Sequence, residues 1–93
     1  MIKSFKCKET QRIFNGLSSR KLPLNIQNRA LDRLEMLKNA KTINDLRIPP
    51  SNHLEPLSGN RKGQWSIRVN DQYRICFVWI NNNAENVELT DYH

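Results

Sequence analysis

The chain has 93 residues, of which 38% are hydrophobic and 26% charged, and fifteen Lys and Arg against nine Asp and Glu give a formal net charge of +6. This length fits one domain covering residues 1–93, since single domains commonly run to about 100–150 residues. No apolar run approaches the roughly 18 residues of a membrane span, and the opening MIKSFKCKET lacks the apolar stretch of a signal peptide. We therefore expect a cytoplasmic protein without a membrane partner, whose positive charge suits a polyanion or an acidic protein.

Two helices are expected in the first half of the chain, after a short strand in MIKSFK. The first helix covers KETQRIFNG, in which Ile13 and Phe14 would face the core and Gly16 would cap the C-terminal end. In IQNRALDRLEMLKNA, apolar residues recur at the spacing of one amphipathic helix face: Ile26, Ala30, Leu34 and Leu37. TIND then carries a capping signal for a short further turn, which the double proline of RIPP ends.

Strands are expected after the prolines, where the hydrophobic period changes to two. HLEPL is a short extended piece, and SGNRKG is a loop. QWSIRV alternates apolar and polar residues, whereas YRICFVWI is apolar on both faces except for Arg74, as is typical of a central strand. NNN then turns the chain into a last strand, NVELTDYH.

The hairpin between the two long strands has a restricted register, because directly opposed residues share a face of the sheet. A two-residue turn would set Ile67 opposite Arg74 and mix the core and polar faces. A loop of residues 70–72 instead pairs Ile67 with Ile75 and Arg68 with Arg74. Since a one-residue slip would invert both faces, we expect an odd loop or a bulge, with the two arginines adjacent on the face away from the helices.

The predicted fold class is α+β, with two N-terminal helices packed on one face of an antiparallel-rich twisted sheet of four to five strands. On the opposite face, the two arginines repel each other unless an acid or a bound anion compensates. Arg68 is expected to pair with an acid of the final strand: Glu85, Glu88 or Asp91. Arg74 is the one charge in an apolar strand, so its guanidinium needs a carboxylate or a phosphate beside it.

Other candidate side chains lie in HLEPLSGNRKG. Glu55 precedes a proline in a strand, where a carboxylate either points to solvent or has a partner. Arg61 and Lys62 are candidates for phosphate contacts, or else form a solvated loop tip, and His53 is interpreted as an exposed loop residue without a role. With two histidines and no C-x-x-C spacing, no metal site is expected. Cys76 is interpreted as a small buried strand residue rather than a reactive thiol.

LEPLSGNRKGQWSIRV, then DQYRICFVW and a final DYH, together resemble the HigB branch of the RelE-like toxins, and MIKSF fits the same branch. The resemblance implies the RelE-like microbial RNase fold and the toxin half of a bacterial toxin–antitoxin pair. Such toxins are ribosome-dependent, metal-independent endoribonucleases that cut the messenger-RNA codon in the A site of the 70S ribosome and so inhibit translation. No cofactor is implied. The implied partners are the ribosome, the messenger RNA and a cognate HigA-like helix-turn-helix antitoxin, with operator DNA contacted only through that antitoxin.

The resemblance also implies site residues, and here the chain departs from the commoner pattern. Many HigB proteins read His-Pro-Leu-Lys where this chain reads Glu-Pro-Leu-Ser, whereas the relative YoeB has Glu-Pro-Leu together with an arginine and a C-terminal histidine. Carried over, Glu55 is the general base, Arg74 the phosphate clamp and His93 the general acid, while Tyr92 orients or stacks on the nucleotide. RNA or phosphate contacts are expected from a wider set: Arg68, Ser58, Arg61, Lys62 and Asp91.

An alternative reading belongs to another class of protein. Ser58 brings no positive charge where many relatives have a lysine. The chain could therefore be a catalytically weak or inactive basic binding module that acts as co-repressor with its antitoxin. Direct DNA binding ranks last, because the sequence contains no helix-turn-helix, and the basic residues of the long helix alternate with acids.

Overall fold

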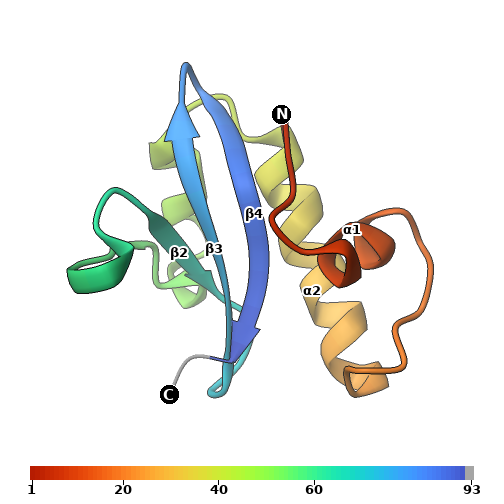
Figure 1. Ribbon diagram of the computed structural model, residues 1–93. Helices are drawn as coiled ribbons and strands as arrows, with labels where there is room; N and C mark the ends of the chain where they lie inside the picture. Colours follow the sequence, from red (N-terminus) through yellow and green to blue (C-terminus); the bar gives the residue numbers. More distant parts are fainter. Residues whose placement is uncertain (92–93) are drawn as a thin grey trace.

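Both predicted helices and four strands form in the computed structural model, which describes residues 1–91 (Figure 1). The helices lie on one side of an antiparallel sheet with the strand order β1-β2-β3-β4. The elements, with three short 3-10 helices labelled η, are α1 (Lys8–Phe14), α2 (Leu24–Asn39), η1 (Ile43–Arg47), η2 (Pro50–Asn52), β1 (Glu55–Pro56), η3 (Gly59–Arg61), β2 (Trp65–Arg68), β3 (Tyr73–Ile80) and β4 (Asn83–Asp91). The expected α+β class is thus confirmed. No helix within residues 1–91 is long and apolar enough to cross a membrane.

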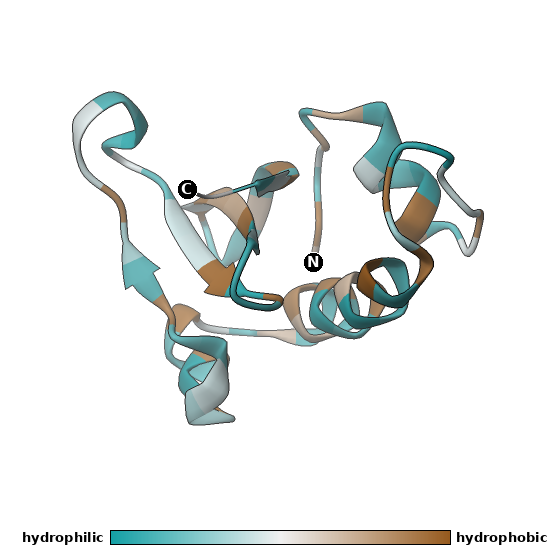
Figure 2. Ribbon diagram, turned by 90° about the horizontal axis from the view of Figure 1, so that it is seen from below, coloured by the Kyte–Doolittle hydropathy of each residue, from teal (hydrophilic) through white to brown (hydrophobic). Residues whose placement is uncertain are grey.

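The core lies between the helices and one face of the sheet (Figure 2). The helices bury the apolar positions that the periodicity predicted, together with Ile13 of α1. The buried residues of both layers are Ile13, Ile26, Ala30, Leu34, Leu37, Ile67, Ile75, Phe77, Ala84, Val87 and Leu89. At the end of α1, Gly16 adopts a φ of +82° and its N–H donates to the carbonyl of Ile13, as expected for a helix C-cap.

The register of the β2–β3 hairpin is the predicted one. Ile67 lies opposite Ile75, and Arg68 lies opposite Arg74. In the loop of residues 70–72, the Asn70 side-chain oxygen accepts hydrogen bonds from the backbone N–H groups that follow it. Apolar side chains therefore face the helices, and the arginines belong to the other face, which we call the open face.

The β3–β4 turn is tighter than predicted. The strand β4 begins at Asn83 rather than at Asn86, because Asn81 and Asn82 both adopt left-handed φ values, of 51° and 63°, and close a two-residue turn. Asn86, at φ 53°, is instead the extra residue of a β-bulge opposite the segment between Cys76 and Val78. The bulge changes the course of β4 where the N-terminal segment joins it.

The N-terminal segment lies beside β4 as a parallel partner. Isolated bridges pair Ile2 with Ala84 and Phe5 with Val87. The N–H of Lys3 donates to the carbonyl of Ala84 at 2.8 Å. The strand expected in MIKSFK is therefore reduced to these two bridges, which cover the outer edge of β4.

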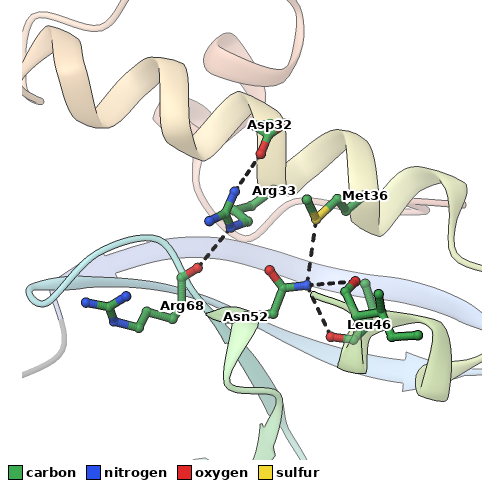
Figure 3. A network of polar contacts seen from close by, with 7 residues as sticks. Asp32, Arg33, Met36, Leu46, Asn52 and Arg68 are labelled. Atoms are coloured by element: carbon green, nitrogen blue, oxygen red, sulfur yellow. Dashed lines mark hydrogen bonds and ion pairs between the residues drawn. The ribbon is translucent and has the colours of Figure 1, made fainter. Parts of the chain in front are cut away.

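The segment that leads from α2 to the sheet is held by a buried amide (Figure 3). Asn52 is fully buried, and its Nδ2 donates to the carbonyl of Leu46 at 3.2 Å, while the sulfur of Met36 lies at 3.7 Å. The next residue, His53, adopts a left-handed φ of 45°. Asn52 thus anchors η1 and η2 under α2 and fixes where the chain enters β1.

Candidate active site on the open face of the sheet

The open face carries a row of side chains that crosses all four strands. Glu55 of β1 is opposite Ser66 of β2, Ser66 is opposite Cys76 of β3, and Cys76 is opposite Glu88 of β4. Neighbouring strands lie about 4.8 Å apart, so this row brings residues from distant parts of the sequence within reach of one long side chain. The adjacent row contains the opposed pair of arginines.

Several contacts constrain the side chain of Arg74. Its Nε donates to Ser66 Oγ at 2.8 Å, and its Nη2 donates to the backbone carbonyl of His53 at 2.6 Å. The same Nη2 lies 3.5 Å from Glu55 Oε1. The side chain of Arg74 is only 13% exposed. Its direction is therefore set by a strand hydroxyl and a loop carbonyl, with the carboxylate as a third and looser contact.

Glu55 contacts Arg74 and is also accessible to solvent. Its side chain is 49% exposed, so the ion pair with Arg74 is screened and contributes little to stability. The following proline is the last residue of the two-residue strand β1, and the strand pairing places Glu55 opposite Ser66. The arrangement presents an accessible carboxylate beside a fixed guanidinium, which are the two charges that proton transfer and phosphate binding at one centre would use.

The side chain of Arg68 has a different partner from the predicted one. Its Nη2 contacts Asp71 of the hairpin loop rather than an acid of β4. Asp71 follows Arg68 by three residues in the hairpin loop, within reach of its side chain. On the backbone side, the carbonyl of Arg68 accepts a hydrogen bond from Arg33 Nε at 3.2 Å (Figure 3). The helix layer thus holds the backbone of Arg68, while its side chain belongs to the open face.

The β1–β2 loop is not simply a solvated tip. Arg61 Nη1 donates to Glu88 Oε1 and to Gln64 Oε1, each at 3.2 Å. Its guanidinium therefore reaches from the loop to β4 across the open face. Ser58 and Lys62, the other loop candidates, are exposed.

Cys76 lies in the middle of this arrangement and is fully buried, as expected. Burial raises the pKa of its thiol, an effect that the nearby guanidinium of Arg61 opposes and the carboxylate of Glu88 reinforces. These charges are thus close enough to Cys76 to affect its ionisation. A buried thiol with a raised pKa is a poor nucleophile, so Cys76 serves the packing of the face.

Asp91, the last residue of β4, is the remaining predicted residue that the structure describes. Asp91 Oδ2 accepts a hydrogen bond from Gln72 Nε2 at 2.9 Å, and Asp91 is paired with Tyr73 in the sheet register. Tyr92 and His93 lie outside the described residues. Within residues 1–91, no three His, Cys, Asp or Glu side chains gather as a candidate metal-binding group.

Sequence reasoning missed both groups that fix Arg74, and it expected Glu88 as a candidate partner of Arg68 rather than of Arg61. Ser66 and the carbonyl of His53 fix Arg74, and Glu88 pairs with Arg61. For Ser66 a signal existed, because the predicted register puts its hydroxyl on the same face as Arg74. For the His53 carbonyl there was none, since its direction depends on a left-handed backbone conformation.

Known proteins resemble this chain along its whole length. A model of the RelE-like toxin of the type II toxin–antitoxin system HigB matches residues 3–93. "Toxin HigB-1" of Vibrio cholerae is 49% identical over 70 residues, covering 75% of this chain and 74% of that protein. "Endoribonuclease HigB" of Proteus vulgaris is 38% identical over 93 residues, the full length of both chains. A solved YoeB–YefM complex from Staphylococcus aureus has a chain with a TM-score of 0.61 and 17% identity, covering 100% of this chain and 98% of that one, which shows a shared fold. The protein therefore belongs to the RelE-like toxins of the HigB type II toxin–antitoxin system.

Proposed function

We propose that this toxin is a ribosome-dependent endoribonuclease that cleaves messenger RNA in the A site without a metal ion. The observation that carries the proposal is the pair of Glu55 and Arg74, whose charged atoms lie 3.5 Å apart on the open face. Family membership and the relative named an endoribonuclease in Proteus vulgaris support the same activity.

In the proposed reaction, the ribose 2′-hydroxyl attacks the adjacent phosphorus and the bond to the 5′-oxygen breaks, which leaves a cyclic phosphate. Glu55 accepts the proton of the 2′-hydroxyl. Arg74 binds the non-bridging oxygens, whose charge grows in the transition state. His93 donates the proton that the departing 5′-oxygen takes up. Because the Arg74 side chain is already fixed by two acceptors, little reorganisation is needed when the phosphate binds.

The other predicted residues have supporting roles in this proposal. Tyr92 stacks on or orients the nucleotide. Arg68 and Lys62 contribute positive charge along the RNA path, and Ser58 offers a single hydrogen bond. Asp91 orients the end of the last strand.

The proposed partners follow from the family. A HigA-like helix-turn-helix antitoxin would inhibit the toxin, and operator DNA would be contacted only through that antitoxin. The ribosome would supply much of the alignment of the codon, since positioning alone contributes a large part of the rate of such a reaction.

The test is to map the 5′ ends of cleaved messenger RNA after brief expression of the wild type and Glu55→Gln. We expect cleavage at A-site codons to fall by about 10²–10⁴-fold in the variant, the usual cost of losing a general base. Glu85→Gln, which changes the net charge equally, is the control and should cleave normally. Wild-type cleavage by Glu55→Gln would refute the assignment of the base.

The same experiment separates the alternative function. A catalytically inactive co-repressor would bind the antitoxin and the ribosome, yet the wild type itself would produce no new 5′ ends. Ser58, which lacks the charge of a lysine, is the observation that favours this alternative.

A further inference from the structure

The ion pair between Arg61 and Glu88 links two elements that are far apart in the sequence. Arg61 ends η3 in the β1–β2 loop, and Glu88 lies on β4 opposite Cys76. Their contact at 3.2 Å therefore extends over β2 and β3, next to the site formed by Glu55 and Arg74. Both side chains are partly exposed, at 30% and 21%.

Such a pair contributes little to stability, because solvent screens both partners. It does determine what the Arg61 guanidinium can bind. Gln64 Oε1, just before β2, accepts a hydrogen bond from the same Nη1 at 3.2 Å. This second contact would keep Arg61 directed over the open face when Glu88 is displaced. A carboxylate and a phosphate can each accept two parallel hydrogen bonds from a guanidinium, so they compete for the same group.

We propose that Glu88 is an internal anion that neutralises Arg61 in the free toxin and is displaced by a backbone phosphate when RNA binds. The proposal rests on the proposed function in taking RNA as the ligand. Arg61 is then a phosphate contact whose affinity is lowered by a competitor built into β4. Weakly bound anions would be disfavoured, since each must first displace the carboxylate.

This exchange has a consequence that a purely structural ion pair lacks. When a phosphate replaces Glu88, the freed carboxylate attracts a cation from solution, which offsets the counterion that the phosphate releases. Removing the carboxylate removes this compensation. The affinity of a Glu88→Gln variant for single-stranded RNA should therefore depend more steeply on salt, with a slope of log K against log[salt] steeper by up to ~0.7.

The experiment measures binding of a short, fluorescently labelled 2′-O-methyl oligoribonucleotide, which cannot undergo 2′-hydroxyl attack, by the full chain between about 50 and 200 mM salt. We expect Glu88→Gln to bind about two- to five-fold tighter than the wild type at low salt. Glu85→Gln is the matched control. Glu85 lies on the same face of β4, opposite Val78, and forms no ion pair within residues 1–91.

A double-mutant cycle assigns the effect to Arg61. In an Arg61→Gln background, adding Glu88→Gln should leave the affinity unchanged. Thermal unfolding checks that each variant is folded, and Glu88→Thr, which suits a strand, replaces Glu88→Gln if the latter does not fold.

Three results would overturn the proposal: equal changes in Glu88→Gln and Glu85→Gln, an unchanged salt slope, or no detectable binding by Glu88→Gln. A gain in affinity that persists without Arg61 would overturn it as well. The proposed function fails separately, through normal cleavage by Glu55→Gln or its absence in the wild type, because the binding assay uses RNA that cannot be cleaved.

Discussion

Replacing Ser66 by Ala tests whether the strand hydroxyl positions Arg74. Ser66 is fully buried, and its Oγ accepts the Arg74 Nε–H at 2.8 Å. The substitution removes one oxygen and leaves almost no cavity, so its main effect is to leave a nitrogen of a charged, 13% exposed guanidinium without this acceptor. Loss of a hydrogen bond to a charged group costs about 1.5–3 kcal/mol. For a domain of this size the Tm should fall by roughly 6 °C or more.

The assay is urea unfolding of wild type, Ser66→Ala, Arg74→Ala and the double variant, followed by cleavage measurements on ribosomes. Ser51→Ala, at an exposed serine of η2, is the control and should stay within about 0.5 kcal/mol of wild type. In the double variant the two losses should not add, because both remove the same contact. Cleavage should fall at least about tenfold in Ser66→Ala, since Arg74 loses part of its orientation. Wild-type stability together with additive losses would refute the reasoning.

Two further predictions concern the elements that support the site. The backbone N–H groups of Lys41 and Thr42, which donate to Asp45 Oδ2 at 2.8 and 3.0 Å, lower the pKa of Asp45 in the folded protein. This stabilisation is present above the pKa that Asp45 has in the unfolded chain, and it is lost as the pH falls from there toward the lower pKa of the folded protein. Asp45→Asn should therefore reduce the fall of the urea unfolding midpoint below about pH 4. An unchanged pH dependence of the midpoint would contradict this. Leu34→Ala, at a fully buried position of α2, should cost about 2–5 kcal/mol in urea unfolding. Leu24→Ala, at a side chain that is 68% exposed, should cost less than about 0.5 kcal/mol, and similar losses in both would contradict the burial of α2.

The register of the β2–β3 hairpin could be predicted from the sequence, because alternate residues of a strand face opposite sides of the sheet. Once Ile67 and Ile75 had to share the buried face, an odd loop was the only solution that kept Arg68 and Arg74 off the helix layer, and the structure has that loop. The helix faces were equally predictable, since the buried side chains of α2 recur at helical spacing. Both results depend on segregation of apolar and polar residues, which is strong in a small core.

Side-chain partners on the open face could not be predicted in the same way. Arg68 was assigned to an acid of β4 but contacts Asp71, and Arg61 instead reaches Glu88. A long side chain can contact several neighbours within one or two strands, and loop geometry decides among them. The start of β4 was missed for a related reason, because two successive left-handed asparagines allowed a turn shorter than the NNN run suggested.

The same register argument explains why the candidate site is built mainly on strands, although the β1–β2 loop supplies one of its cations, Arg61. The row that starts at Glu55 and ends at Glu88 is fixed by backbone pairing, so the backbone positions of the two acids keep their separation when side chains move. The guanidiniums of Arg74 and Arg61 reach over this row from different directions, and each contacts one of those carboxylates. Acids thus lie at both ends of the row, and each is paired with an arginine. In the proposed function, an RNA phosphate entering this face would be attracted by the two cations and repelled by the two acids, which would favour one position for the phosphate along the row.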